Sequence, residues 1–119
     1  MNAALRFFVV FNALLLCLVA FAGCRRVDIR EIEISTPGVR CEACADIVRE
    51  ALSGFSGVDP DRITVDTANG VTRLVYDSMK LALKNIEFAI IAAGFDANEL
   101  PADPEARAQL PVECRAHAD

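Results

Sequence analysis

Two cysteines, Cys41 and Cys44, stand three positions apart, between a segment with strand character and a segment with helix character. Thiolates are soft ligands that select Cu(I), Zn(II) and related ions such as Hg(II), and the N-terminus of a helix favours thiolate over thiol. Two thiolates satisfy an ion that accepts near-linear coordination, whereas Zn(II) usually takes four ligands. The pair therefore predicts a site for one soft metal ion, Cu(I) or Hg(II) before Zn(II).

The neighbours of the two thiols are expected to tune this site. Gly38 and Val39 support the loop, and Arg40 directly precedes the first cysteine. We expect the Arg40 guanidinium to favour ionised thiols and to offset part of the charge of a bis-thiolate complex. Glu42 acts in the opposite sense, although an acid suits the first turn of a helix. An exposed site with two ligands also lets a partner's thiol reach the metal, which suits transfer or capture.

Two other interpretations of the cysteine pair remain open. Outside the cytoplasm, Cys41 and Cys44 could form a plain disulfide, which would leave a domain that only docks another protein. A C-x-x-C motif near a βαβ pattern also occurs in thioredoxin-like proteins. The loop, however, has no aromatic residue or proline between or beside the thiols. A thiol–disulfide redox module is therefore the alternative function from another class.

Composition excludes several other classes of function. The chain has 119 residues, which suggests one domain, and 12 Lys and Arg against 17 Asp and Glu give a net charge of −5. This balance gives no reason to expect a nucleic-acid partner. With one histidine and no phosphate-binding loop, the sequence shows no catalytic constellation, so we expect no enzyme. The cysteines do not form the pattern of a disulfide framework; they are Cys17, Cys24, Cys41, Cys44 and Cys114.

The N-terminus predicts a secretory signal. The uncharged apolar run 7–22 is shorter than the roughly 20 residues of a spanning helix and suits the apolar region of a signal peptide. It ends in small residues before Cys24, which resembles the lipobox of bacterial lipoproteins, where the cysteine is lipidated; Phe21 departs from the usual leucine. The alternative is an uncleaved anchor flanked by Arg25 and Arg26. Both interpretations place the soluble part outside the cytoplasm and close to a membrane.

The rest of the chain predicts an α+β frame. Alternating apolar residues indicate strands, a helical stripe indicates each of two helices, and Asn69-Gly70 indicates a hairpin turn. Asp77-Ser78 is expected to cap the second helix. The expected elements are strand 32–34, helix 43–55, strand 63–65, strand 71–76, helix 79–93 and a short strand within 95–100. This order predicts a ferredoxin-like βαββαβ sandwich, with a four-stranded antiparallel sheet and two helices on one face.

With the loop and the element order in place, residues 32–100 resemble the heavy-metal-associated domain of copper chaperones, of metal-pumping ATPases and of the periplasmic mercury-binding protein. The motifs that carry the resemblance are the loop 38–44, the hairpin 65–71, Tyr76-Asp77 and the segment 86–97. Val39 departs from the pattern, because this family usually has an inward-packing methionine there. The resemblance implies a bound metal ion, Cys41 and Cys44 as its ligands, and a metal transporter or metal-accepting protein as partner.

These assignments divide the chain into a signal peptide (1–23), a tether (24–31) that begins at the lipidated Cys24, a heavy-metal-associated domain (32–100) and a tail (101–119). At about 3.5 Å per residue, the tether keeps the domain within roughly 25 Å of the membrane.

The tail carries two more metal-competent residues. Asp103-Pro104 predicts the start of a short helix that Pro111 ends, and Cys114 and His117 follow. We hypothesise that Cys114 approaches Cys41 and Cys44 as a third thiolate. The alternative is a free cysteine on a mobile tail, and His117 is expected to be solvated.

The second helix carries apolar residues outside its core stripe. Leu83, Ile86, Ile90 and Ala93 form the expected stripe, and Phe88 and Ile91 lie outside it. We expect Leu110 and Val112 of the tail to cover these two side chains, with a partner protein or the membrane surface as the alternatives.

Overall fold

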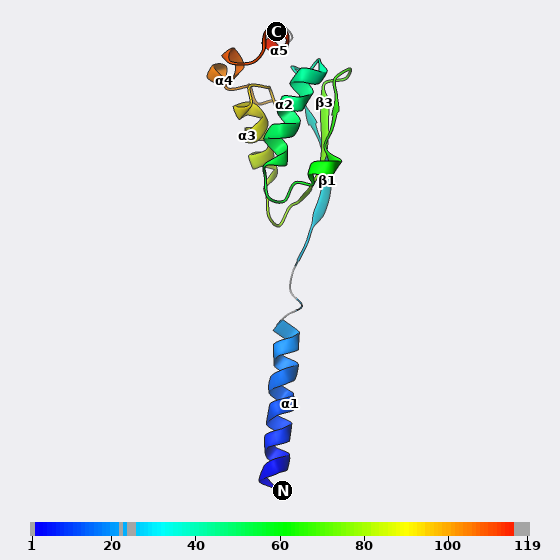
Figure 1. The fold of residues 1–119 in the computed structure, drawn as a ribbon, viewed down its shortest axis with the longest axis vertical. Coiled ribbons are helices and arrows are strands. Elements are labelled where there is room, and N and C mark those ends of the chain that lie inside the picture. Colours follow the sequence, from blue (N-terminus) through cyan, green and yellow to red (C-terminus); the bar gives the residue numbers. More distant parts are fainter. Residues whose placement is uncertain (1, 22, 24–25, 116–119) are drawn as a thin grey trace.

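The computed structural model describes residues 2–21, 23 and 26–115 of the chain. A long N-terminal helix stands apart from a small α+β domain that carries a helical tail (Figure 1). The elements are α1 (Ala3–Phe21), β1 (Ile29–Ser35), α2 (Glu42–Ser53), the 3₁₀ turn η1 (Pro60–Arg62), β2 (Thr64–Asp66), β3 (Val71–Asp77), α3 (Leu83–Ala92), α4 (Pro104–Ala108) and α5 (Val112–Arg115).

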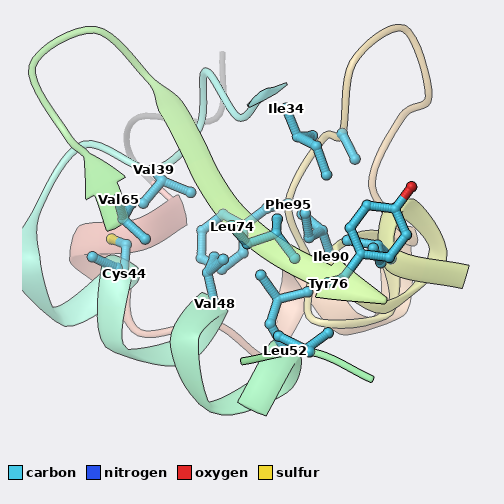
Figure 2. Close-up of a cluster of buried hydrophobic side chains, with 14 of the residues drawn as sticks. Ile34, Val39, Cys44, Val48, Leu52, Val65, Leu74, Tyr76, Ile90 and Phe95 are labelled. Carbon is cyan, nitrogen blue, oxygen red and sulfur yellow. The ribbon is translucent and has the colours of Figure 1, made fainter. Parts of the chain in front are cut away.

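One antiparallel sheet and two helices form the domain. The strand order is β1-β3-β2, and both outer strands pair with β3. Helices α2 and α3 contact each other and lie on one face of this sheet (Figure 1). Their apolar stripes and the inner face of the sheet enclose the core (Figure 2); its largest fully buried side chains include Ile34, Val48, Leu52, Leu74, Ile86 and Ile90. The ferredoxin-like fold predicted from the sequence is confirmed.

The strand expected within 95–100 is not formed, and the sheet of the described residues has three strands. Asn98 adopts a left-handed backbone conformation with φ of 55°, which an extended strand cannot accommodate. Its backbone N–H donates to the Ser35 carbonyl oxygen at 2.8 Å, and its side-chain Oδ1 accepts from the Ser35 N–H at 3.0 Å. A single asparagine therefore attaches this segment to the end of β1 in place of a ladder of backbone hydrogen bonds.

Asn98 also ties the same turn to helix α3. Its Nδ2 donates to Oε1 of the buried Glu87 at 2.7 Å, and Lys84 Nζ lies 2.8 Å from Glu87 Oε2. The hydrogen bond from Lys84, followed by that from Asn98, holds the pKa of Glu87 below its usual value. The buried carboxylate is thus charged and paired, as a buried charge must be to be tolerated.

Helix α3 begins at Leu83, four residues later than the sequence pattern predicts. Asp77 Oδ1 accepts from the backbone N–H of Met79 at 3.0 Å and from that of Asp28 at 3.1 Å, and Lys80 N–H donates to the Asp77 carbonyl oxygen. Asp77 therefore caps the turn that follows β3 and holds the residue before β1. It does not cap α3. As a result Leu83 sits in the first turn and is 40% exposed, outside the core.

The tail folds back over the C-terminal end of α3. The Asp103 side chain accepts from the Ala106 N–H at 3.1 Å and caps α4, as the Asp-Pro pair predicts, while the Asp103 N–H donates to the Ile91 carbonyl oxygen at 3.2 Å. Leu110 is buried in the domain core. An added Cβ on Gly94 would lie 3.0 Å from Leu110 Cγ. A residue without a side chain is therefore what lets the tail approach so closely.

The tail covers only part of the apolar surface of α3 that it was expected to cover. Ile91 is half-buried against the core, but Phe88 remains 57% exposed, and Val112 is 70% exposed. Of the two tail residues expected to cover Phe88 and Ile91, Leu110 is buried in the core against which Ile91 packs, whereas Val112 is exposed and Phe88 stays uncovered.

Helix α1 is long and apolar enough to cross a membrane by length and composition, and a secretory signal near an N-terminus has the same features. Its described side chains are exposed. The predicted lipidation site Cys24 and the predicted solvated His117 lie outside the described residues.

The β2–β3 hairpin holds the cysteine loop in place. The Thr36 N–H donates to the Gly70 carbonyl oxygen at 2.8 Å, and the hydroxyl groups of Thr36 and Thr72, both fully buried, lie 2.9 Å apart. Gly70 has φ of 64°, and a Cβ there would lie 2.9 Å from Pro37 Cα. The start of the loop therefore rests on a position that only glycine fills without strain.

Gly70→Ala is expected to lower the free energy of unfolding by about 1–3 kcal/mol, because it combines a left-handed backbone with a collision against Pro37. The measurement is urea denaturation of the full chain, followed by circular dichroism. Gly54→Ala is the matched control: Gly54 has φ of −76° and nothing within 4 Å of an added Cβ, so this change should leave stability unchanged or raise it. An equal loss in both variants would contradict the role assigned to Gly70.

Candidate metal centre

The two predicted ligands lie at the start of α2. Cys41 is the N-cap residue, with an extended backbone and no capping hydrogen bond from its side chain, and Cys44 follows in the first turn. The Ala45 N–H donates to the Cys41 carbonyl oxygen at 3.0 Å and closes that turn. Both sulfurs are thus held at the N-terminal, positive end of the helix dipole.

The two thiols differ in exposure. Cys44 is fully buried and packs with Val39 and Val65 at the edge of the core (Figure 2), whereas Cys41 is half-buried. Val39 is itself fully buried, so it packs inward at the position where the family usually has methionine. Solvent or a partner can reach the loop through Cys41, and Cys44 is reached only from within the fold.

Gly38 and Arg40 complete the loop. An added Cβ on Gly38 would meet Phe95 Cδ1 at 3.7 Å, which is an ordinary contact. Arg40 is exposed, and its Nε donates to the Pro37 carbonyl oxygen at 2.7 Å, bracing the turn before Cys41. The influence of Arg40 on the thiols stays a prediction.

The charge of Glu42, which opposes thiolate formation, is paired. Arg49 Nη1 lies 2.7 Å from Glu42 Oε1 and 2.8 Å from Asp46 Oδ1. The hydrogen bond to Glu42 is the main cause that raises the pKa of Arg49. The pair is largely exposed and contributes little to stability, but it reduces the negative potential beside Cys41.

The tail brings Cys114 to the loop. Helix α5 contacts α2 and lies beside its start (Figure 1), and the Sγ atoms of Cys41, Cys44 and Cys114 all lie within 4.8 Å of one another. Cys44 and Cys114 form a disulfide across 70 positions of sequence, with Cα atoms 5.6 Å apart. Cys41 is a free thiol whose Sγ lies 2.6 Å from Cys44 Sγ.

The observed disulfide differs from each pairing considered from the sequence. The chain does not join Cys41 to Cys44, and Cys114 is not a free cysteine on a mobile tail, because it is fully buried. In this oxidised form only Cys41 offers a thiol. Reduction would leave three thiols within 4.8 Å of one another, and thiolates are the ligands that soft metal ions prefer.

The three cysteines were identified from the sequence, but the contacts that hold Cys114 beside the loop were not. Gly94 is predicted only as a helix stop, whereas in the structure an added Cβ there would also lie 3.1 Å from the Ala106 carbonyl oxygen. The Cys114 N–H donates to the Pro111 carbonyl oxygen at 2.9 Å, so the proline that ends α4 also starts α5. The available signal for this packing was the spacing of Leu110 and Cys114 around Pro111 in the tail.

The family model described as the heavy-metal-associated domain matches residues 33–96. The chain belongs to the heavy-metal-associated domain family. Cys41 and Cys44 lie inside the matched region, and Cys114 lies outside it.

Relatives with this domain have different overall architectures. The chain is 32% identical over 89 residues to the cation-transporting ATPase HMA5 of Oryza sativa subsp. japonica, a match that covers 71% of this chain but only 9% of that ATPase. It is 28% identical over 67 residues to the mercuric transport protein periplasmic component of Pseudomonas aeruginosa, covering 56% of this chain and 71% of the relative. The chain thus corresponds to one small part of the ATPase.

Solved structures of the family share the fold. The CopZ metallochaperone aligns with a TM-score of 0.54 at 28% identity, covering 57% of this chain and 98% of CopZ. A copper-binding domain of HMA7, a P-type ATPase, gives 0.54 at 29% identity, with 58% and 90% coverage. Oxidised MerP from Ralstonia metallidurans CH34 gives 0.55 at 24% identity, with 60% and 96% coverage, which supports the fold alone.

Peptide mapping tests the disulfide. In protein purified without reductant, alkylated and then cut with trypsin, peptide 41–49 should be linked to peptide 108–115 and should carry one alkyl group, on Cys41. After reduction, both peptides should be unlinked and every cysteine in them alkylated. A disulfide within peptide 41–49, with an alkylated Cys114 in peptide 108–115, would contradict the observed pairing.

Proposed function

We propose that this heavy-metal-associated domain binds one soft metal ion outside the cytoplasm, Cu(I) or Hg(II) rather than Zn(II), through Cys41 and Cys44, and transfers or sequesters it. The observation that carries the proposal is the placement of two thiols at the N-terminus of α2 within this family's frame. The metal is cargo, and the domain performs no catalysis on it.

The unequal exposure of the two thiols supports transfer. A metal bound between a half-buried and a fully buried sulfur is accessible from the Cys41 side only. A partner's thiolate can therefore approach along one path, bind the ion and displace the two ligands in turn. One relative is named a mercuric transport component and another a cation-transporting ATPase, so the partner class we propose is a metal transporter or a metal-accepting protein.

Metal titration of the reduced full chain in detergent, under anaerobic conditions, tests the binding. Native mass spectrometry with Cu(I), Hg(II) and Zn(II) should show one retained ion, held more tightly for Cu(I) or Hg(II) than for Zn(II). The Cys41→Ser/Cys44→Ser variant should lose it, because both soft ligands are gone. Cys17→Ser, on the exposed face of α1, is the control and should bind as the wild type does. A fully reduced wild type that holds no ion would refute the proposal.

A thiol–disulfide exchange module is the second candidate function. It is favoured by one observation, the contact of the free Cys41 thiol with the disulfide between Cys44 and Cys114. Catalytic turnover of a dithiol substrate, together with no retained metal, would support it over metal handling. A domain that only docks another protein would show neither property.

We further propose that the domain is tethered to a membrane. The proposed parts are a signal peptide (1–23), a lipidated Cys24 that opens the tether (24–31), the domain (32–100) and the tail (101–119). The apolar helix α1 and the periplasmic relative support this arrangement. The competing arrangement retains α1 as an uncleaved anchor, and both hold the site outside the cytoplasm.

Intact-mass spectrometry of the chain expressed in a bacterial host separates the two arrangements. Lipoprotein processing should remove residues 1–23 and add lipid mass at Cys24. Cys24→Ser should block both changes, because the modified thiol is absent. A wild-type mass that still includes residues 1–23, without lipid, would instead establish the uncleaved anchor.

A further inference from the structure

We propose that, in the reduced protein, Cys114 is a third ligand to the ion held by Cys41 and Cys44, and that this three-sulfur site favours soft divalent ions over monovalent ones. The inference rests on the proposed function, since it names the metal class of the same site. The carrying observation is a cysteine from outside the family's matched region that lies against both loop cysteines.

The tail fixes Cys114 independently of its bond to Cys44. Leu110 is buried against Gly94 and the core. The Ala102 N–H donates to Asp96 Oδ1 at 2.7 Å, and the side chain of Arg115 donates to the Ala108 carbonyl oxygen at 3.4 Å. None of these contacts involves the disulfide. Cys114 is therefore held near the loop as a preorganised ligand, which avoids most of the entropic cost of recruiting it.

The sulfur positions require only small changes to surround an ion. Three thiolates that bind one ion at about 2.3 Å stand about 4 Å apart. The three Sγ atoms already lie within 4.8 Å of one another, with Cys41 and Cys44 at 2.6 Å. Once the disulfide is reduced, the sulfurs separate by side-chain rotation toward the spacing of a three-coordinate ion.

Because two of the three sulfurs are buried, the net charge of the metal complex determines which ions the third sulfur stabilises. Cys44 and Cys114 are both fully buried, and burying an uncompensated charge is costly. A third thiolate takes a divalent complex from a net charge of zero to −1, but it takes a monovalent complex from −1 to −2. Since the Born cost rises with the square of the charge, the third sulfur helps a divalent ion more. The helix dipole of α2 offsets a single negative charge better than two.

Among divalent ions, the number of ligands favours the Hg(II) type over Zn(II). The cluster formed by the described residues offers three ligand atoms, whereas a structural Zn(II) site almost always has four. A soft ion that accepts three sulfurs is satisfied by this chain alone.

The test compares Cys114→Ser with the wild type as reduced full chain in detergent. X-ray absorption of the Hg(II)-loaded protein should show three sulfur ligands in the wild type and two in the variant. Competition with a small dithiol chelator should show a loss of Hg(II) affinity of at least about tenfold and a smaller loss for Cu(I). Glu113→Gln, an exposed neighbour on α5, is the matched control and should change neither quantity.

The outcomes separate this inference from the proposed function. Unchanged affinity and two sulfur ligands in both proteins, with binding abolished in Cys41→Ser/Cys44→Ser, would overturn the third ligand and leave the two-cysteine site intact. Equal losses for Hg(II) and Cu(I) would overturn the preference for divalent ions. If Cys114→Ser fails to fold, Cys114→Ala keeps the buried position apolar and gives the same comparison. Absence of any bound ion in the wild type would refute the proposed function itself.

Discussion

The structure of the site depends on the burial of one sulfur, that of Cys44, in the first turn of α2. A fully buried sulfur can react only with groups that the fold itself brings to it. The loop supplies Cys41 on one side, and the tail supplies Cys114 on the other. Everything that positions these two neighbours, from the Gly70 hairpin beneath the loop to the Gly94 contact beneath the tail, therefore acts on the chemistry of Cys44.

The sequence predicted the frame because its signals are local and periodic. The alternation in β1 and β3, the stripe of α2 and the cysteine spacing each extend over a few residues, and the resulting order leaves few topologies. The Asp103-Pro104 signal for the start of α4 was equally local, and α4 begins at Pro104 in the structure. These predictions hold because local preference and tertiary packing agree at those positions.

The predictions that failed depend on contacts between distant residues. Asn98 replaces a strand because its side chain and backbone both bond to Ser35, a partner 63 positions away. The Asp77 carboxylate caps a turn and also accepts a hydrogen bond from the backbone N–H of Asp28, 49 positions away. The approach of Cys114 to the loop was hypothesised from the sequence, but the packing of Leu110 on Gly94 that accompanies it was not, because a glycine that ends a helix carries no sign of what will pack on it. Local residue patterns therefore do not identify positions whose conformation depends on contacts with distant residues.

If the chain is tethered to a membrane near its N-terminus, as proposed, the position of the site would favour exchange of metal with a soluble partner over exchange at the membrane. β1 (Ile29–Ser35) begins within the proposed tether and ends before the cysteine loop, and its seven residues span about 20 Å at strand rise. The start of α2 therefore lies at the end of the domain away from α1 (Figure 1). At that end Cys41 is open to solvent while the tail closes the opposite side of Cys44. A partner's thiol would then approach through Cys41, and a bound ion would leave only after its contact to the buried Cys44 sulfur is broken. A third, buried ligand would slow that release, so the same tail that raises affinity would shift the balance from rapid transfer toward retention.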